Sequence, residues 1–425
     1  MMPASTDRWN RDEPDGPIVR SLLDLDYYKL TMGQWVFRRH RATAVTYAFV
    51  NRTETVRLAD WIAEAPLRAE LDHVRTLRLT AQESAYLRGL QSGGRRLFDE
   101  AYLTFLAGLR LPAYRLAMAD GVLHLHFDGP WPEAIYWETI ALAIVTELYG
   151  RALAARQPGL EREKLLTEGR RRLAAKIAVL RDRPDITFTD FGTRRRFSRS
   201  WQDEVDATLA EALPGRFLGT SSVASAQRLG IAPIGTMAHE LFMGRAALAD
   251  ASDDGLRASS RQVLEDWWED YGAALSIALT DTWGSEFFFR DMTPEQARRW
   301  KGLRQDSGDP FAFGERALHF YEACGVDARE KVIVFSNGLA LETIVALADR
   351  FAGRIGVTFG WGTNLTNDLG LSPPSMVIKL AAAGGRPTVK LSDNLAKAMG
   401  PPELVERYRR VFGQIVPPAY QACRY

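Results

Sequence analysis

The stretch PIGTMAHE, residues 233–240, ends in a histidine and a glutamate, and His239 is one of only six histidines in 425 residues. A histidine here could be a hydrogen-bonded interior residue, a metal ligand, a general base or the carrier of a covalent group. No second histidine or cysteine lies nearby in the sequence, which argues against a purely metal-binding role. Glu240 could orient the imidazole, or it could cap the helix that begins at LFMGR.

Arginines follow two other short apolar runs. DFGTRRR contains Arg194, Arg195 and Arg196, and GLRQDSGDP contains Arg304. A guanidinium binds carboxylate or phosphate in a bidentate manner, so we expect Arg194 and Arg304 to face an anionic ligand. For Arg195 and Arg196 we favour a solvated helix start.

Two aspartates occupy similar positions at the ends of apolar runs. Asp281 lies in LTDT and Asp306 in GLRQDSGDP. Carboxylates suit Mg²⁺ or the hydroxyls of a sugar, although an aspartate after a strand also commonly caps the next helix. Acids and arginines at one rim together indicate an anionic, metal-bound substrate with hydroxyls, such as a sugar phosphate.

Glycines follow the last two apolar runs of this kind. Asn337-Gly338 ends one run, and Gly360, Gly362 and Thr363 end the next. Glycine lets backbone N–H groups approach a phosphate closely, and a following helix adds a favourable dipole. The sequence has no P-loop and none of the G-x-G-x-x-G, G-x-S-x-G or H-E-x-x-H motifs. These residues therefore predict phosphate-binding loops on another scaffold.

The elements that must position these residues alternate between short apolar runs and helical patterns. Parallel strands follow from such alternation, in a doubly wound sheet or a barrel, and polar residues at the strand ends favour a barrel. Seven runs show the pattern: 186–192, 216–222, 233–240, 275–282, 302–308, 332–338 and 357–364.

The two ends of the chain differ from this rhythm. Residues 43–53 and 114–131 alternate like antiparallel strands, with Ala-Asp-Gly as a turn, and 375–394 read as a hairpin around Ala-Gly-Gly-Arg. We expect an α+β domain over 1–140 and an α/β barrel over 141–374. We expect residues 375–425 to return to the first domain.

Composition limits the partners. The formal net charge is +1, with 46% hydrophobic and 25% charged residues, so no overall field favours nucleic acid or a membrane. The apolar window IYWETIALAIVTELYG contains two glutamates and predicts a buried helix instead of a membrane span. The polar N-terminus is not expected to be a signal peptide, and the two distant cysteines fit a reducing cytosol. We expect a cytoplasmic protein.

An ordered set of motifs resembles the nicotinate phosphoribosyltransferase family of bacteria and fungi. The set comprises SLLDLDYYKLTMGQWVF, DFGTRRRFS, FLGTSS, PIGTMAHE, LTDT, GLRQDSGDP, VFSNGL, FGWGTNLTND and VIKL…KLSD. The resemblance spans residues 18–415 and implies an irregular α/β barrel with an N-terminal α/β sandwich, usually dimeric. It implies that nicotinate and phosphoribosyl pyrophosphate give nicotinate mononucleotide and pyrophosphate, the first step of NAD salvage. ATP hydrolysis and Mg²⁺ belong to the implied reaction.

The resemblance also implies roles for particular residues. His239 matches the histidine that becomes phosphorylated, and Phe191 matches an aromatic ring that stacks on the pyridine. Tyr28 matches a second ring, which comes from the partner subunit of a homodimer. Arg194 and Arg304 match arginines that contact the anionic substrates. Further matches are Asp281 and Asp306 near metal and ribose, and Asn337, Gly338, Gly362 and Thr363 in the 5′-phosphate loops.

Single positions bear on the choice of substrate, and two motifs depart from the pattern of the family. Ser221 of FLGTSS stands where nicotinamide-using relatives carry an aspartate, and a neutral hydroxyl favours nicotinate by removing a like charge. SNGL departs from S-D-N-L, and GWGTN departs from an arginine-bearing variant at Asn364. Both departures lie in the predicted phosphate loops.

Three other functions compete with this interpretation. A nicotinamide phosphoribosyltransferase is the nearest. A sugar-phosphate aldolase or isomerase would need a catalytic lysine or carboxylate base, and Lys301, Lys331 and Lys379 lie at strand starts or in the hairpin, away from the expected catalytic rim. A non-catalytic sensor of NAD precursors would be expected to lose His239 or the acids, which are present.

Overall fold

The computed structural model describes residues 16–156, 161–414 and 416–422. The helices of the N-terminal part are α1 (Tyr28–Arg39), α2 (Leu58–Trp61), α3 (Glu64–Thr76), α4 (Ala81–Gly89), α5 (Glu100–Ala107), α6 (Trp131–Ala134), α7 (Trp137–Arg156) and α8 (Arg162–Arg181). Those of the rest are α9 (Arg199–Ala212), α10 (Val223–Leu229), α11 (His239–Leu248), α12 (Asp253–Tyr271), α13 (Ser285–Asp291), α14 (Pro294–Arg299), α15 (Pro310–Ala323), α16 (Leu341–Phe351), α17 (Thr363–Thr366) and α18 (Pro402–Phe412). Short 3₁₀ helices are η2 (Thr193–Arg195), η3 (Gly272–Leu275), η4 (Ala328–Glu330) and η5 (Leu395–Lys397).

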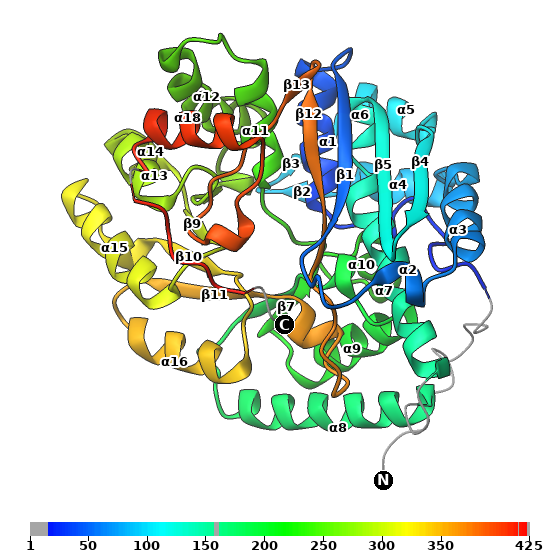
Figure 1. Cartoon of the computed structure of the whole chain (residues 1–425). Helices are drawn as coiled ribbons and strands as arrows, with labels where there is room; N and C mark the ends of the chain where they lie inside the picture. The colour runs from blue at the N-terminus through cyan, green and yellow to red at the C-terminus, as the bar shows by residue number, and fades with distance from the viewer. Residues whose placement is uncertain (1–15, 157–160, 415, 423–425) are drawn as a thin grey trace.

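A five-stranded sheet joins the N-terminal part to a distant segment. Its order is β13-β12-β1-β5-β4. β12 pairs antiparallel with β1, and orange β12 lies beside blue β1 in Figure 1. A chain segment near the C-terminus therefore completes the N-terminal sheet. The strands are β1 (Ala44–Asn51), β4 (Tyr114–Ala119), β5 (Val122–Pro130), β12 (Met376–Ala383) and β13 (Arg386–Pro387), with a separate ribbon of β2 (Gln91–Ser92) and β3 (Arg95–Arg96).

Two tight turns set the strand register in this sheet. Asp120 and Gly121 have φ of 52° and 80°, as a type I′ turn requires, and they join β4 to β5 as the predicted hairpin. Gly384 and Gly385, with φ of 56° and 74°, join β12 to β13. The prediction that the second strand of the hairpin extends to residue 394 is wrong, because the pairing between β12 and β13 ends at Pro387. Beyond it the chain runs to the other sheet.

A six-stranded parallel sheet carries the βα rhythm. Its order is β7-β6-β11-β10-β9-β8. β6 and β11 are the first and the last of these strands along the chain, and they pair with each other, as a closed barrel requires. The strands β7 and β8 lie at the two edges of the sheet. The mixed α/β class is therefore confirmed, and closure into a barrel stays a prediction. The strands are β6 (Phe188–Asp190), β7 (Phe217–Thr220), β8 (Ile277–Leu279), β9 (Gly302–Gln305), β10 (Val332–Phe335) and β11 (Gly356–Trp361).

The run at 233–240 is not a strand, contrary to expectation. It forms one parallel bridge, Thr220↔Pro233, beside β7, and then enters α11 at His239. Pro233 lacks the N–H that a ladder needs. Gly235 passes so close to α1 that an added Cβ would lie 3.0 Å from the Tyr28 backbone nitrogen. Packing against α1 therefore replaces strand pairing here.

Helix α7 links the two sheets. It is buried on almost every side and packs against α3, β12 and η2. A helix that is apolar all round belongs inside a protein, so the buried helix predicted from IYWETIALAIVTELYG is confirmed. None of the helices in the described ranges combines the length and apolarity needed to cross a bilayer.

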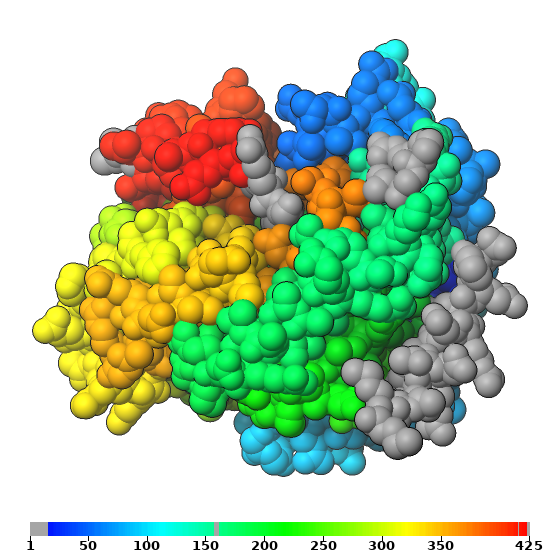
Figure 2. Space-filling view, turned by 90° about the horizontal axis from the view of Figure 1, so that it is seen from below, coloured from blue at the N-terminus to red at the C-terminus, as the bar shows by residue number. Residues whose placement is uncertain are grey.

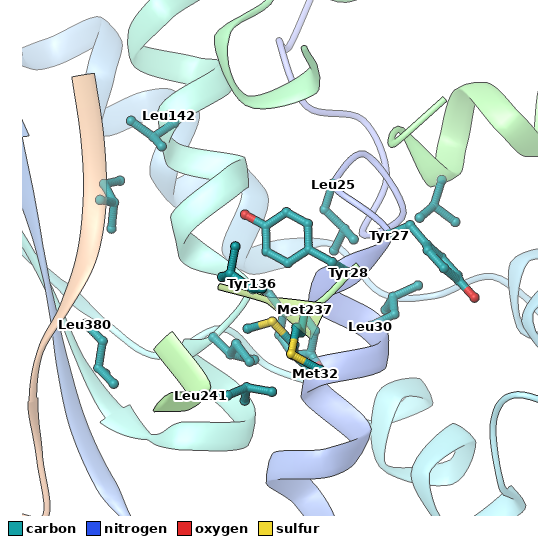
Figure 3. Close-up of a cluster of buried hydrophobic side chains, with 14 of the residues drawn as sticks. Leu25, Tyr27, Tyr28, Leu30, Met32, Tyr136, Leu142, Met237, Leu241 and Leu380 are labelled. Atoms are coloured by element: carbon teal, nitrogen blue, oxygen red, sulfur yellow. The ribbon is translucent and has the colours of Figure 1, made fainter. Parts of the chain in front are cut away.

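The core extends from α7 to the segment that carries His239. Met237 lies against Met32 of α1 (Figure 3), and the Ala238 N–H points to the Met32 sulfur at 3.2 Å. Leu241 of α11 and Leu380 of β12 are also fully buried in this cluster. Seen from below in Figure 2, the orange part of the chain lies between the blue and green surfaces. The C-terminal segment pairs with the N-terminal sheet through β12 and then contacts the loop after β8 of the other sheet.

Candidate active site

A cavity of about 990 Å³, counting the part open to solvent, lies at the C-terminal ends of the parallel strands. Loops after parallel strands share one edge of a sheet, which is why residues far apart in sequence meet here. Most of the predicted site residues line it: Tyr28, Phe191, Arg194, Ser221, His239, Arg304, Asp306, Asn337, Gly338, Gly360, Gly362 and Thr363. Asp281 lies directly behind His239, and Glu240 points elsewhere.

His239 is the first residue of α11, and its imidazole is almost fully buried. Its Nδ1 lies 3.0 Å from the Thr282 hydroxyl. Its Nε2 lies 3.0 Å from Asp306 Oδ2 and 3.0 Å from Lys390 Nζ. Burial, with help from the Lys390 charge, lowers the pKa of His239 to about 4. The imidazole is therefore neutral at pH 7 and keeps a lone pair for a nucleophilic or metal-binding role.

Lys390 reaches His239 from the segment that leaves the N-terminal sheet after β13. The Leu391 N–H donates to the Thr282 carbonyl, which holds this segment beside the loop after β8. Burial lowers the pKa of Lys390 to about 7, against the opposing charges of Asp281 and Asp306. A lysine with this pKa can bind an anion or exchange a proton near neutral pH.

Asp281 and Asp306 provide carboxylates next to His239. Although burial alone would raise it, Arg304 and Lys397 hold the pKa of Asp306 well below its usual range. His239 and Lys390 likewise lower the pKa of Asp281. Asp281 Oδ1 is buried, with no hydrogen-bond partner in the described part of the chain. One ligand atom from each of Asp281, Asp306 and His239 lies within 4.8 Å of the others, so the two carboxylates fit a hard cation such as Mg²⁺.

Glu240 does not orient the imidazole, contrary to one of our two expectations. Its carboxylate accepts hydrogen bonds from Lys29, from the Tyr47 hydroxyl, and from Trp131 Nε1 at 3.0 Å. Successive residues of a helix point about 100° apart, so His239 and Glu240 face different surroundings. The orienting groups of His239 are Thr282, Asp306 and Lys390 instead.

The side chains of the three adjacent arginines after β6 point to different partners. Arg194 Nη1 donates to the Tyr28 hydroxyl at 2.9 Å and lines the cavity. Arg195 also lines the cavity, and its Nε donates to the Met376 carbonyl at 3.0 Å. Arg196 is 1% exposed and forms a bidentate pair with Asp24. The solvated helix start that we favoured for Arg195 and Arg196 is therefore wrong, because both turn inward to partners distant in sequence.

Arg304 is held rigidly at the end of β9. Its Nη1 donates to the Met237 carbonyl at 3.0 Å, and its Nε donates to the Ser336 hydroxyl at 3.1 Å. Its Nη2 lies 3.4 Å from Asp306 Oδ1. The guanidinium thus joins the loop before α11 to the loops after β9 and β10. A fixed fork of this kind costs little entropy when an anion binds.

Both aromatic rings of the site come from one chain. Tyr28 of α1 and Phe191, next after β6, line the same cavity. We expected Tyr28 to reach the site of a partner subunit, and the structure places it in its own chain's site, bonded to Arg194. Gly360 allows the position of Phe191, because an added Cβ would lie 2.3 Å from that ring. Gly360 therefore supports the ring, in addition to the phosphate role expected for it.

The two predicted phosphate loops are connected to each other. Gly338 has φ of 57°, which glycine adopts readily. The Asn364 amide, at the position of one departure, donates to the Leu339 carbonyl at 2.9 Å. Lys397 of η5 donates to the Asn337 side chain at 2.9 Å. The departures in SNGL and GWGTN therefore supply contacts that fix both loops.

Sequence reasoning missed several charged residues of the cavity. Among the residues that the structure describes, seven basic and two acidic side chains line it, a balance that favours a multiply charged anion. Lys379 was set aside as lying in a hairpin, but β12 does not follow the βα rhythm, so the strand-end rule does not apply to it. The quoted SLLDLD and VIKL…KLSD motifs contained three of these residues without assigning them roles. The additional charged residues are Asp26, Arg52, Arg195, Lys379, Lys390 and Lys397.

Comparisons with known proteins agree with this geometry. Residues 23–146 match the family model of the nicotinate phosphoribosyltransferase N-terminal domain, and residues 186–415 match the nicotinate phosphoribosyltransferase family. A crystal structure of nicotinate phosphoribosyltransferase from Vibrio cholerae is similar over 94% of each chain, with 33% identity and a TM-score of 0.83. One from Porphyromonas gingivalis is similar over 93% of this chain and 100% of its own, with 30% identity and a TM-score of 0.81.

Proposed function

This chain belongs to the nicotinate phosphoribosyltransferase family, and we propose that it couples the transfer to ATP hydrolysis through phosphorylation of His239. It is a phosphoribosyltransferase enzyme of NAD salvage from nicotinate. The observation that carries the proposed coupling is the neutral imidazole of His239. It faces a cavity whose charged lining residues are mainly basic.

The transfer itself needs no protein nucleophile. The ring nitrogen of nicotinate forms a bond to the anomeric carbon of phosphoribosyl pyrophosphate as the bond to the pyrophosphate oxygen breaks. Tyr28 and Phe191 hold the pyridine, and the loops at Asn337 and Thr363 hold the 5′-phosphate. Arg304 stabilises the negative charge that develops on the departing pyrophosphate. Asp281 and Asp306 would hold Mg²⁺, which supplies further positive charge there.

ATP coupling uses the same rim. A nitrogen of His239 bonds to the γ-phosphorus of ATP while the bond to the ADP oxygen breaks, and water later cleaves the phosphohistidine to give phosphate. The phosphoryl group brings negative charge close to Lys390, Arg304 and Lys397. These contacts would order the loops that carry the basic residues and strengthen substrate binding. The coupling therefore acts through binding.

Incubation with γ-labelled ATP tests this proposal. We expect an acid-labile phosphate that maps by mass spectrometry to the peptide containing His239. An absence of label under conditions that support nicotinate mononucleotide formation would contradict the coupling. That result would not contradict the transferase activity.

Ser221 supports nicotinate over nicotinamide, which is the alternative substrate. Its hydroxyl lies at the end of the cavity lined by the Tyr28 and Phe191 rings, here called the ring end, and is 2.9 Å from the Thr193 hydroxyl. A side-by-side assay with the two pyridines separates the two activities. We expect product from nicotinate and far less from nicotinamide.

Replacing Gly360 with alanine should weaken pyridine binding. The new methyl group would displace the Phe191 ring, and overpacking of this kind costs about 1–3 kcal/mol. We expect KM for nicotinate to rise about tenfold or more, with a smaller change in kcat. Gly89→Ala is the matched control, since nothing lies within 4 Å of its added Cβ. Equal KM values for the two variants would refute the supporting role of Gly360.

We propose that each chain carries a complete site even if the protein forms a homodimer. Tyr28 and Phe191 belong to one cavity, so no ring is needed from a second copy. Specific activity should therefore stay constant on dilution through any dimer dissociation, as followed by light scattering and initial rates. A fall of activity in step with dissociation would indicate shared sites.

The cellular setting follows from the same chemistry. We propose a cytoplasmic enzyme whose partners are its small-molecule substrates, nicotinate, phosphoribosyl pyrophosphate and ATP, without nucleic acid or membrane. The net charge of +1 supports this, because no overall field attracts a polyanion.

A further inference from the structure

Asp26 is a buried carboxyl group at the ring end of the cavity. It is 2% exposed and lines the cavity together with Tyr28, Phe191, Arg194 and Ser221. Its Oδ2 has no hydrogen-bond partner among the described residues. Buried polar atoms are almost always paired, so a free one beside a ligand cavity points to a ligand contact.

The groups around Asp26 come from four different elements. Arg194 of η2 supplies positive charge that lowers the pKa of Asp26. Asp190 at the end of β6 and Glu138 of α7 add negative charge, and the Ser221 hydroxyl after β7 hydrogen-bonds the carboxyl group. Burial raises the pKa of Asp26 to about 6, with Arg194 and Ser221 opposing the rise.

A hydrogen-bond chain already occupies the Ser221 hydroxyl. Gln202 Nε2 donates to Thr193 Oγ1 at 2.8 Å, and the Thr193 and Ser221 hydroxyl oxygens lie 2.9 Å apart, a bond in which either hydroxyl can be the donor. The single proton of Ser221 therefore goes to Thr193 or to Asp26, with which Ser221 also hydrogen-bonds. A serine hydroxyl has one proton to donate, so Ser221 in this arrangement cannot also donate to a substrate. The donor to a pyridine carboxylate must lie elsewhere.

We propose that Asp26 is a specificity-determining residue that reads the substituent of the pyridine through its free Oδ2. The inference rests on the proposed function. Protonated Asp26 donates to the carboxylate of nicotinate, so binding takes up one proton from solvent and no covalent bond changes besides this O–H. Ionised Asp26 accepts from the amide N–H of nicotinamide, with no proton uptake. Arg194 beside it adds a charge that favours the carboxylate.

A proton linkage follows, with a definite sign. Below about pH 6 Asp26 is already protonated, and nicotinate affinity is independent of pH. Above that pH the proton must be acquired on binding, so affinity falls by up to about tenfold per pH unit. Nicotinamide affinity does not fall in this range. The preference for nicotinate should therefore decrease as pH rises.

Calorimetric titration of the full-length protein with nicotinate and with nicotinamide tests the inference. Runs at pH 7.5 in two buffers of different protonation heat count the protons taken up. We expect close to one proton for nicotinate and none for nicotinamide. In Asp26→Asn, where the amide donates without titrating, we expect no uptake and an affinity for nicotinate that is flat with pH. Asp128→Asn, at an exposed pair with Arg115, should behave as wild type.

The outcomes are distinct. Nicotinate binding by the wild type without proton uptake would overturn the role of Asp26, with Arg194 left to hold the carboxylate, and the transferase would stand. Unchanged uptake in Asp26→Asn would overturn it equally. Absence of nicotinate binding and of product would overturn the proposed function together with this inference. Even if the variant fails to fold, the absence of proton uptake by the wild type overturns the inference, and Asp26→Asn separates uptake at Asp26 from uptake at Lys390.

Discussion

Replacing His239 with asparagine should abolish the coupling of ATP hydrolysis to product formation. Asparagine approximates the size and the hydrogen bonds of the imidazole but cannot accept a phosphoryl group at nitrogen under these conditions. Thr282 and Asp306 keep a partner, so the cavity should retain its shape. We expect loss of the acid-labile phosphate and of ATP stimulation, while transfer without ATP persists. Paired assays of phosphate release and of nicotinate mononucleotide measure both.

The control for this variant is His124→Asn. His124 lies exposed on β5, outside the cavity, and should keep full coupling. Full ATP stimulation in His239→Asn would exclude the phosphohistidine. A loss of transfer both with and without ATP would place His239 in the transfer step itself.

Replacing Lys29 with methionine should lower the free energy of unfolding by about 3–5 kcal/mol, the usual cost of removing one partner of a buried ion pair. The ammonium group is fully buried, forms an ion pair with Glu240, and lies 2.6 Å from Glu138 Oε2. Methionine fills similar volume but leaves two carboxylates facing each other in the core, with Lys379 still 3.3 Å from Glu138. Denaturant unfolding followed by intrinsic fluorescence measures the change.

The pH dependence of this effect has a fixed direction. Although burial would raise it, Lys29 and Lys379 hold the pKa of Glu138 below its usual range. A lowered carboxyl pKa contributes stability above its unfolded value and loses it as pH falls through the folded value. The contribution of ionised Glu138 to the wild type should thus be full at neutral pH and be lost only in strong acid. In Lys29→Met the buried carboxylates lack this cation and bind protons at higher pH, so the difference between the two proteins should shrink as pH falls.

Lys164→Met provides the matched control. Lys164 is 67% exposed and pairs with Glu161 across one helical turn, so its loss should change stability by less than about 0.5 kcal/mol. A similarly small effect in Lys29→Met would mean that water or a rearrangement of the core stabilises the charges of Glu138 and Glu240 in place of Lys29. The ion pairs of Lys29 with Glu138 and Glu240 would then contribute little to stability.

Much of the fold and site could be predicted from the sequence because the signals are local. The βα rhythm, the Asp-Gly turn and the apolar α7 follow from the spacing of neighbouring residues, and six of seven expected runs form strands. Parallel strands bring their C-terminal ends to one edge, so Arg304 and Asp306 could be placed at one rim without knowing their contacts. The resemblance added roles to these positions.

The tertiary structure alone decided which side chains act together at that rim. Lys390 contacts His239 because the chain leaves the N-terminal sheet after Pro387 and runs to the loop after β8, a path set by pairing between β12 and β1. Tyr28 lies in its own chain's site because α1 packs beside the loop after β6, where Arg194 donates to the Tyr28 hydroxyl. Arg196 and Glu240 turn to buried partners instead of to solvent or to His239. Sequence patterns fix the face on which a charge lies, but its partner and its pKa depend on burial and on charges brought close by distant segments.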